Sequence, residues 1–541
     1  MQRINLFSKL NKQTTLVSAI WGLIVSICLV WGYELETRGS IFDGGVKALL
    51  IWIVLFVAFS LVAYFVNIFL DKVSNDEPAG ETQIVKKILY VCIFAAIIFI
   101  LWFPAFLAVY PGWFNYDAPW QIYMYRDGII SSHHPVIHTY LLGIIVEKIH
   151  VWKVAHGDYA YNYNTSIAIY NVFQMLVCAL GLGYQVEFIY GRILKKCIKS
   201  IRYSMTGIML VFFGLYPPIV LLAMSPTKDV FFGIFYLLLI IEVYKIFREN
   251  RKPGVLFTIL VILCTIYRQN TEYVFLLLAI PFLILLAKKY GRKHLLCGII
   301  CVAVSIAALF IYKGPFYSAM DIQPGSKVEF LSVPSQQIVS VYLNHGDELA
   351  DEDKLLIEKL FSDEAFEGYR PKLADETKGN LNLDVMNSNK KSYASLYLRL
   401  FRQYPDEYFD SFLILNYGLW YPDATMDLYE DGKNLYFSNE SQLAIISSKL
   451  PALENYYMSL GTVGHGLKRV LLMPGIALFL VFFVFLRGCR NRDTAVVLTG
   501  LATILILATF LLGPCASIRY LYYMYILVPL LIANAFIGKK R

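Results

Sequence analysis

The stretch ILYVCIFAAIIFILWFPAFLAVY, residues 88–110, contains no charged side chain, and the more polar stretch PGWFNYDAPWQ, residues 111–121, follows it directly. A helix needs about 20 apolar residues to cross the ~30 Å hydrocarbon core of a bilayer. Similar stretches recur along the 541-residue chain, which is 57% hydrophobic and 16% charged. Because soluble domains carry about 25% charged residues, this composition excludes a soluble globular enzyme and indicates a membrane protein with many spans.

Apolar windows of this kind predict an all-α polytopic membrane protein with about 12 transmembrane helices. The windows are 14–33, 47–70, 88–110, 163–190, 203–222, 229–247, 254–268, 272–288, 294–312, 467–487, 494–513 and 518–537. The first window follows basic residues, as in a signal peptide, but it lacks a small-x-small cleavage site. We therefore expect it to be a retained helix.

Lys and Arg residues are concentrated in alternate short loops, which the positive-inside rule places in the cytoplasm. These loops account for the net charge of +8, so the charge gives no reason to expect nucleic-acid binding. The alternation predicts cytoplasmic N- and C-termini, and it closes only if the short apolar stretch 136–151 does not cross the membrane. We expect this stretch to be re-entrant or to lie on the outer face as a juxtamembrane helix.

The pattern divides the chain into four parts. We expect two N-terminal spans in residues 1–87, and a transmembrane core in residues 88–312 with its first external loop at 111–162. A mainly helical extracytoplasmic domain follows in residues 313–466, and three C-terminal spans complete the chain in residues 467–541. None of the nine cysteines lies in residues 313–466, so no disulfide supports that domain.

Ionisable residues beside hydrocarbon are costly and therefore candidates for function, and here they gather on the predicted outer side. Asp117 lies among aromatic residues just after the third span, where a partly desolvated carboxylate can act as a general base or a metal ligand. The alternative is that Asp117 only caps the next helix. His133 and His134 suit a metal or a phosphate, but no third and fourth ligand follow at metal-site spacing. A divalent metal is therefore possible and its ligands are unknown.

Three cations on the same side predict an anion site. Arg268 and Arg519 can form bidentate hydrogen bonds with a phosphate, and Lys228 starts a helix whose dipole favours an anion. The alternatives are arginines that reach lipid headgroups and an interfacial ion pair of Lys228 with Asp229. The residues expected to contact substrate are Tyr116, Trp120, Gln121, His133, His134, Asp229, Asn270 and Tyr520.

The residues discussed above lie in short blocks, which are Tyr110-Pro-Gly-Trp-Phe-Asn-Tyr-Asp117, His133-His-Pro, Ser225-Pro-Thr-Lys-Asp229, Tyr267-Arg-Gln-Asn270, Gly418-Leu-Trp-Tyr-Pro-Asp423 and Ile518-Arg-Tyr520. With these residues the chain resembles the glycosyltransferase-C superfamily of polytopic bacterial membrane proteins, related to the dolichyl-phosphate-mannose-type mannosyltransferases and the arabinosyl transferases that modify lipid A. It is more similar to an uncharacterised bacterial branch whose members share similar blocks. The resemblance covers about residues 88–537, so the first two spans look like an addition in front of the core.

The resemblance implies a transferase that takes a sugar from a polyprenyl-phosphate donor and uses an acid of the first external loop as its base. Asp117 fits that position. Many members carry two adjacent acids there, whereas Ala118 follows Asp117 in this chain. This departure leaves a paired-carboxylate mechanism and a bound metal as open questions.

The leading hypothesis is an inverting glycosyl transfer to a cell-envelope glycan or lipid at the extracytoplasmic face. Asp117 would deprotonate the acceptor hydroxyl while Lys228, Arg268 and Arg519 stabilise the leaving lipid phosphate. The chain has no nucleotide-binding fingerprint, which fits a donor already activated on a lipid, and we expect no cofactor beyond the possible metal. The alternatives are a transporter or flippase of a lipid-linked or anionic substrate and a non-catalytic membrane scaffold.

Overall fold

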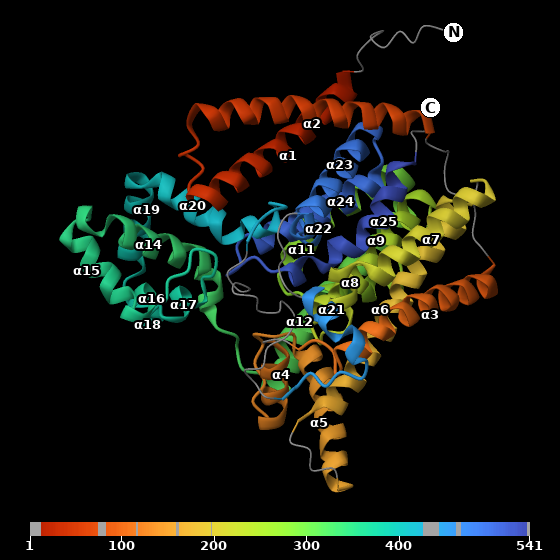
Figure 1. The fold of residues 1–541 in the computed structure, drawn as a ribbon, viewed down its shortest axis with the longest axis horizontal. Coiled ribbons are helices and arrows are strands. Elements are labelled where there is room, and N and C mark those ends of the chain that lie inside the picture. Colours follow the sequence, from red (N-terminus) through yellow and green to blue (C-terminus); the bar gives the residue numbers. More distant parts are fainter. Residues whose placement is uncertain are drawn as a thin grey trace.

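The computed structural model describes residues 12–73, 83–114, 117–157, 162–195, 197–425, 443–460 and 467–537. Within these ranges every regular element is a helix, and the described backbone pairs outside helices only as isolated bridges. Figure 1 shows a helical bundle with a second group of short helices beside it. The all-α class predicted from the sequence is confirmed.

Eight helices of the described ranges are long and apolar enough to cross a membrane. They are α1 (Lys12–Arg38), α2 (Gly45–Val73), α3 (Ile84–Ala108), α6 (Asn164–Phe188), α9 (Lys228–Arg248), α11 (Thr271–Tyr290), α12 (Arg292–Ile311) and α25 (Tyr522–Ala535) with its preceding turn. A ninth span results if α7 (Lys199–Leu215) and α8 (Pro217–Ala223) count as one helix bent by 56°. The bend falls at Tyr216, because a residue that precedes proline is forced out of the helical conformation.

The remaining predicted windows also contain helices, but these are shorter. They are α10 (Val255–Tyr267), α23 (Gly475–Asn491) and α24 (Thr494–Phe510), with 13, 17 and 17 residues. Each of the twelve windows is therefore helical, and eight or nine of the segments have the length that a spanning helix requires. The protein is an all-α membrane protein.

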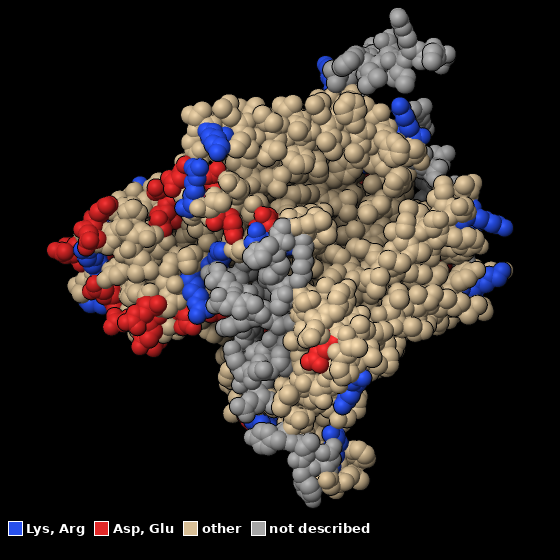
Figure 2. Space-filling model, in the orientation of Figure 1, with Lys and Arg blue, Asp and Glu red and all other residues tan. Residues whose placement is uncertain are grey.

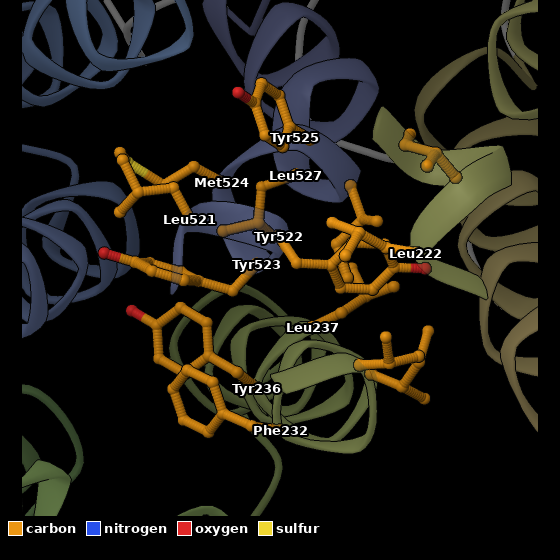
Figure 3. Packing of buried hydrophobic residues seen from close by; sticks show 14 of the residues in the cluster. Leu222, Phe232, Tyr236, Leu237, Leu521, Tyr522, Tyr523, Met524, Tyr525 and Leu527 are labelled. Atoms are coloured by element: carbon orange, nitrogen blue, oxygen red, sulfur yellow. The ribbon is translucent and has the colours of Figure 1, made fainter. Parts of the chain in front are cut away.

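The centre of the bundle lies where α9 packs against α25 and its preceding turn. Figure 3 shows Phe232 and Tyr236 of α9 facing Tyr523, while the Tyr522 ring lies to the other side, and all four side chains are buried. Gly233 permits this close approach, because a Cβ atom there would lie 2.7 Å from the Tyr522 ring. The packing fixes the first turn of α9 relative to the turn that contains Arg519, and both of these carry predicted site residues.

Two helices at one end of the bundle come from the predicted first external loop. α4 (Asp117–Asp127) packs on α5 (Val136–Ala155), which in turn packs on α6. α5 contains the stretch 136–151, which was expected not to cross the membrane, and α5 is not among the candidate spans. Its location at a membrane surface stays a prediction. In Figure 1 both helices project from the bundle.

Much of the predicted extracytoplasmic domain forms a group of short helices with a core of its own. Its longer helices are α14 (Ser332–His345), α15 (Asp351–Leu360), α19 (Lys390–Gln403) and α20 (Pro405–Asn416). They enclose a cluster of buried side chains that includes Val339, Ile357, Leu396 and Tyr408, separate from the core of the bundle. Figure 2 shows acidic side chains gathered over this group, whereas the visible face of the bundle is largely uncharged.

The rest of that region runs along the bundle. The Ser447 N–H donates to the Tyr110 carbonyl at 2.7 Å, and the Tyr163 N–H donates to the Leu443 carbonyl at 2.8 Å. α21 (Pro451–Leu460) then packs on α3. This segment therefore covers the ends of two candidate spans near α4 and α5.

Basic loops that the sequence places on one side of the membrane do contact each other. Asp71 pairs with Arg487 at 2.8 Å and with Arg490 at 2.5 Å, and Arg248 pairs with Asp493 at 2.6 Å. These contacts lie at the ends of helices remote from α4. The geometry agrees with the predicted grouping of the loops, while the identity of the compartment stays a prediction.

Candidate functional site

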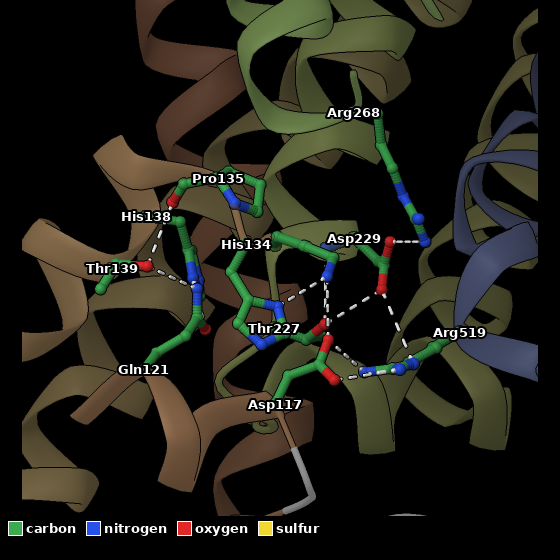
Figure 4. A network of polar contacts seen from close by, with 11 residues as sticks. Asp117, Gln121, His134, Pro135, His138, Thr139, Thr227, Asp229, Arg268 and Arg519 are labelled. Carbon is green, nitrogen blue, oxygen red and sulfur yellow. Dashed lines mark hydrogen bonds and ion pairs between the residues drawn. The ribbon is translucent and has the colours of Figure 1, made fainter. Parts of the chain in front are cut away.

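Asp117 begins α4, and its carboxylate contacts two cations from distant parts of the chain (Figure 4). Lys228 Nζ lies 3.0 Å from Asp117 Oδ2, and Arg519 Nη1 lies 2.8 Å from the same oxygen. Arg519 Nη2 also donates to Asp117 Oδ1 at 3.3 Å. The three side chains are largely buried, with exposed fractions of 14%, 12% and 17%.

These cations decide the protonation state of Asp117. Burial raises the pKa of the carboxyl, but the charges of Arg519 and Lys228 outweigh burial and hold the pKa well below its usual range. Asp117 is therefore ionised at neutral pH and accepts hydrogen bonds. It becomes a stronger base only when it loses contact with these cations.

A second carboxylate, Asp229, lies in the first turn of α9 and is 1% exposed. It forms an ion pair with Arg268, and Arg519 Nε lies 3.9 Å from its Oδ2 atom. Thr227 caps α9 and donates its hydroxyl hydrogen to Asp229 Oδ2 at 3.1 Å. We call Asp117, Lys228, Asp229, Arg268 and Arg519 the Asp117 cluster. Its three cations and two carboxylates give a net charge of +1.

His134 contacts the cluster through Lys228. Its ring Nδ1 atom lies 3.3 Å from Lys228 Nζ, and the side chain is buried. Burial, together with the charge of Lys228, lowers the pKa of His134 to about 3. The imidazole is thus neutral at pH 7, and Nδ1 accepts a hydrogen bond from the lysine. His133 is exposed and packs edge-on against His134, with 4.7 Å between ring centroids.

The described residues contain no group of three or more His, Cys, Asp or Glu side chains placed to hold a metal ion. The carboxylates of the Asp117 cluster instead contact cations. Within the part of the chain that the structure describes, the arrangement suits an anion better than a divalent metal.

Arg268 follows the last residue of α10 and lies against two aromatic rings. Its guanidinium carbon is 4.6 Å from the Tyr520 ring centroid and 4.8 Å from that of Phe510. These contacts, together with Asp229, hold the guanidinium in place. Tyr520 thus supports Arg268. Asn270 Nδ2 donates to Thr509 Oγ1 at 2.9 Å, so its amide is hydrogen-bonded to α24.

The other predicted substrate residues have varied surroundings. Trp120 is 64% exposed and packs edge-on against Tyr123, outside the ion-pair network. Gln121 is buried and bonds to α5: its Oε1 lies 3.0 Å from His138 Nδ1 and its Nε2 donates to Thr139 Oγ1 at 3.1 Å. Tyr116 lies outside the described residues. In contrast to these residues, Asp117, Lys228, Arg268 and Arg519 all belong to the ion-pair network described above.

A polar chain that the sequence analysis missed joins α4, α5 and α6. His138 contacts Gln121 through Nδ1, and its Nε2 atom lies 2.9 Å from the hydroxyl of Tyr170. Burial and the charge of Lys228 lower the pKa of His138 to about 3, so the ring is neutral. The matching tautomer carries its hydrogen on Nδ1, donates it to Gln121 and accepts from Tyr170 at Nε2.

Two amides of α6 hold the loops that carry the charged residues. Gln174 Nε2 donates to the carbonyls of Ser225 at 2.6 Å and Ala223 at 3.0 Å, while its Oε1 accepts from the Thr227 N–H at 3.4 Å. Asn171 Nδ2 donates to the Pro111 carbonyl at 2.9 Å. The signal was present in the sequence, because two amide side chains three residues apart share one face of a helix inside an apolar window.

Gly112 is required where these loops meet. Its φ is +104°, and a Cβ atom there would lie 2.4 Å from Asn171 Nδ2 and 2.6 Å from the Met224 carbonyl oxygen. The next residue, Trp113, donates its N–H to that same carbonyl at 3.0 Å. Only glycine fits this combination of conformation and close contact. The Asp117 loop and the Lys228 loop are thereby locked together.

An apolar cavity of about 100 Å³ lies between α9, α10, α11 and α24. Phe232, one turn along α9 from Lys228, lines it, as does Thr271, whose hydroxyl donates to the Arg268 carbonyl at 2.6 Å. The cavity therefore begins within about one helical turn of two cations of the Asp117 cluster.

The fold and the cluster define an all-helical membrane protein with a partly buried ion-pair site at one end of its bundle. The chain belongs to the Family of unknown function (DUF6020), whose profile matches residues 126–533. The match contains Lys228, Arg268 and Arg519 and begins after Asp117. No curated protein and no solved structure matches the chain.

Proposed function

We propose that this protein is a membrane glycosyltransferase of the glycosyltransferase-C type, with about 12 spans and cytoplasmic termini. It moves a sugar from a polyprenyl-phosphate donor to a cell-envelope glycan or lipid at the extracytoplasmic face. The observation that carries the proposal is the contact of Asp117 with Lys228 and Arg519. A candidate base and two candidate phosphate ligands share one partly buried site.

The donor phosphate would bind at the cations. A sugar phosphodiester carries one negative charge, which balances the net charge of +1 in the Asp117 cluster. Arginine forks suit phosphate oxygens, and their charge has a large effect in a site from which water is largely excluded. The nearby apolar cavity would take the first part of the polyprenyl chain.

The transfer is a single displacement. Asp117 takes the proton of the acceptor hydroxyl, and the oxygen forms a bond to the anomeric carbon on the face opposite the phosphate. The bond from that carbon to the phosphate oxygen breaks, and its electron pair leaves with the polyprenyl phosphate. Lys228, Arg268 and Arg519 stabilise the second negative charge that develops on the leaving phosphate.

Binding of the donor also activates the base. Asp117 and the donor phosphate compete for Lys228 and Arg519, since both are anions that pair with the same cations. Each contact that passes from Asp117 to the phosphate removes a cause of its low pKa. Asp117 is therefore a weak base alone and a stronger one beside a bound donor, which favours donor binding before proton removal.

The test uses purified protein in nanodiscs with a panel of polyprenyl-phosphate sugars and cell-envelope acceptors. We expect Asp117→Asn to lower the rate of transfer by about 10²- to 10⁴-fold, the usual contribution of a general base. Binding of polyprenyl phosphate should persist, because the cations lose a competing carboxylate. Asp127→Asn is the matched control, since Asp127 lies on the same helix and is exposed.

Equal transfer by Asp117→Asn and the native protein contradicts the assigned base. Movement of an intact lipid-linked or anionic substrate across proteoliposomes, without cleavage of the phosphate ester, identifies a transporter or flippase instead. Binding without either activity leaves the non-catalytic scaffold.

A further inference from the structure

α1 and α2 form a hairpin at one edge of the molecule and supply no residue to the Asp117 cluster (Figure 1). Within the described residues α1 nevertheless contacts α20 as well as α23. Close contact also occurs at Gly32, where a Cβ atom would lie 2.2 Å from the ring of Tyr421, a residue that follows α20. The last turns of α1 therefore pack directly on residues 417–425.

Glu36, near the end of α1, is the centre of this contact. Its carboxylate accepts hydrogen bonds from the Tyr417 hydroxyl, from Thr425 Oγ1 at 2.7 Å and from the Thr425 N–H at 3.2 Å. Glu36 is only half-buried, whereas Tyr417 is buried. One carboxylate of the hairpin thus fixes two points of the segment 417–425.

Lys372 continues the connection away from α1. Its Nζ atom donates to Thr425 Oγ1 at 2.6 Å and lies 5.3 Å from the centroid of the Tyr417 ring. The Thr425 hydroxyl therefore accepts from Lys372 and donates to Glu36. A cation and a carboxylate from opposite parts of the chain hold the same hydroxyl between them.

The two residues after Lys372 contact the turn that leads to Arg519. The Ala374 N–H donates to the Pro514 carbonyl at 2.8 Å, and Leu373 forms an antiparallel bridge with Cys515. Arg519 follows four residues after Cys515, in the short helix Ile518–Leu521. A displacement of Lys372 would therefore move the backbone that places the Arg519 guanidinium.

We propose that Glu36 and Lys372 are positioning residues through which the N-terminal hairpin sets the place of Arg519 in the Asp117 cluster. The path runs from Glu36 through the Thr425 hydroxyl to Lys372, and from there through residues 373–374 to the turn 514–515. The catalytic consequence rests on the proposed function, whereas the structural coupling does not. The N-terminal hairpin thus helps to hold the Asp117 cluster in place.

Hydrogen–deuterium exchange in nanodiscs tests the coupling without any assay of transfer. The variants are Glu36→Gln, Lys372→Met and Thr425→Val, the last of which removes the shared hydroxyl and keeps both charged residues. The loss of one hydrogen bond changes a local opening equilibrium by roughly two- to tenfold. We expect exchange of amides 515–520 to increase by that factor, with no further increase when Glu36→Gln and Lys372→Met are combined.

Lys391→Met is the matched control, because Lys391 is an exposed lysine of the same helical group. Lys372→Arg should restore exchange at 515–520 to the native rate. Unchanged exchange at 515–520, with faster exchange at 417–425, overturns the proposal because the effect then ends before the site. If transfer is detected, the KM for the donor should rise in Lys372→Met while kcat changes less. Absence of transfer in the native protein contradicts the proposed function and leaves the exchange result to decide the coupling.

Discussion

The two ends of the bundle both contain buried arginines paired with aspartates, but the pairs differ in what surrounds them. At one end Asn67 and Asp71 of α2 contact Arg487 and Arg490 of α23, and Arg487 Nε also donates to the Ala535 carbonyl at 3.0 Å. We call these four residues the Asp71 cluster. It joins helix ends through side chains and a backbone carbonyl.

The Asp117 cluster gathers its charges from four separate segments and has an apolar cavity beside it. Asp229 within it is 1% exposed, whereas the Asp71 side chain is 44% exposed. Burial of charge is costly, so an arrangement that buries five charged groups beside a cavity requires a reason that helix anchoring does not supply. The arginines are largely buried in both clusters, whereas the carboxylates are largely buried only in the Asp117 cluster, and this difference, with the adjoining cavity, favours the Asp117 cluster as the candidate site.

Removal of a cation from the Asp117 cluster should lower the rate of transfer, whereas we expect no such loss from a substitution in the Asp71 cluster. Lys228→Gln keeps a polar side chain but removes the charge beside Asp117, and we expect transfer to fall by about 10²- to 10³-fold, as for loss of one donor that stabilises developing charge. Steady-state rates with a polyprenyl-phosphate sugar measure this. A variant with native kcat and KM would place the phosphate elsewhere.

Gln174→Leu tests whether the loops need their buried support. The substitution keeps the volume approximately but removes the donor to the carbonyls of Ala223 and Ser225. A shift of about 1 Å in a reacting group can lower a rate about 10²-fold, so we expect a loss of that order in transfer. Gln185→Leu, on the same helix and also buried, is the control. Equal losses in both variants would indicate general damage to α6.

Much of the fold was predictable, because the hydrocarbon core imposes a length that the sequence shows directly. Each apolar window is helical, and the stretch 136–151, which was expected not to cross the membrane, lies in α5. The number of crossings was less certain from sequence, because α10 has 13 residues and Tyr216 divides α7 from α8. Hydropathy measures composition, whereas crossing depends on where a helix begins, ends and bends.

The charged residues of the candidate site were predictable from the sequence, whereas the packing and hydrogen bonds that hold them in place were not. Asp117, Lys228 and Arg519 stand out because a charge beside an apolar window is costly. Their pairing across 402 residues depends on the packing of α9 against α25, which no local pattern reveals. His138 lies in the stretch 136–151 but was assigned no role, because its hydrogen-bond partners Gln121 and Tyr170 are on two other helices.

In the Asp71 cluster, Arg487→Gln should change stability and leave transfer per folded molecule unchanged. Arg487 is 2% exposed, and its loss leaves the Ala535 carbonyl and Asn67 with fewer partners. We expect a loss of about 1–3 kcal/mol, the cost of unsatisfied buried polar groups, seen as a lower melting midpoint in nanodiscs. Reduced kcat at a temperature where the variant is fully folded would show that the two ends of the bundle are coupled.

The smallest predicted effect is on the pH dependence of stability. It is expected for the Asp117 cluster, which His134 contacts, and not for the Asp71 cluster, which contains no histidine. His134 faces Lys228, Asp117, His133 and Arg519, and its pKa in the folded protein is lowered to about 3. In the unfolded chain a histidine titrates near ~6.5, so between these values the unfolded state binds a proton that the folded state does not. Stability therefore falls as pH decreases through this window, by up to about 1.4 kcal/mol per pH unit for one histidine.

His134→Asn removes that proton from the unfolded state, so its melting midpoint between pH 7 and pH 5 should fall less steeply than that of the native protein. Part of the slope should remain, because the pKa of His138 is also lowered to about 3 and responds in the same direction. His133→Asn is the control, since that ring is exposed. Identical slopes for the native protein and His134→Asn would mean that His134 is protonated in the folded state, and Lys228 would then lack the acceptor on which its position beside Asp117 depends.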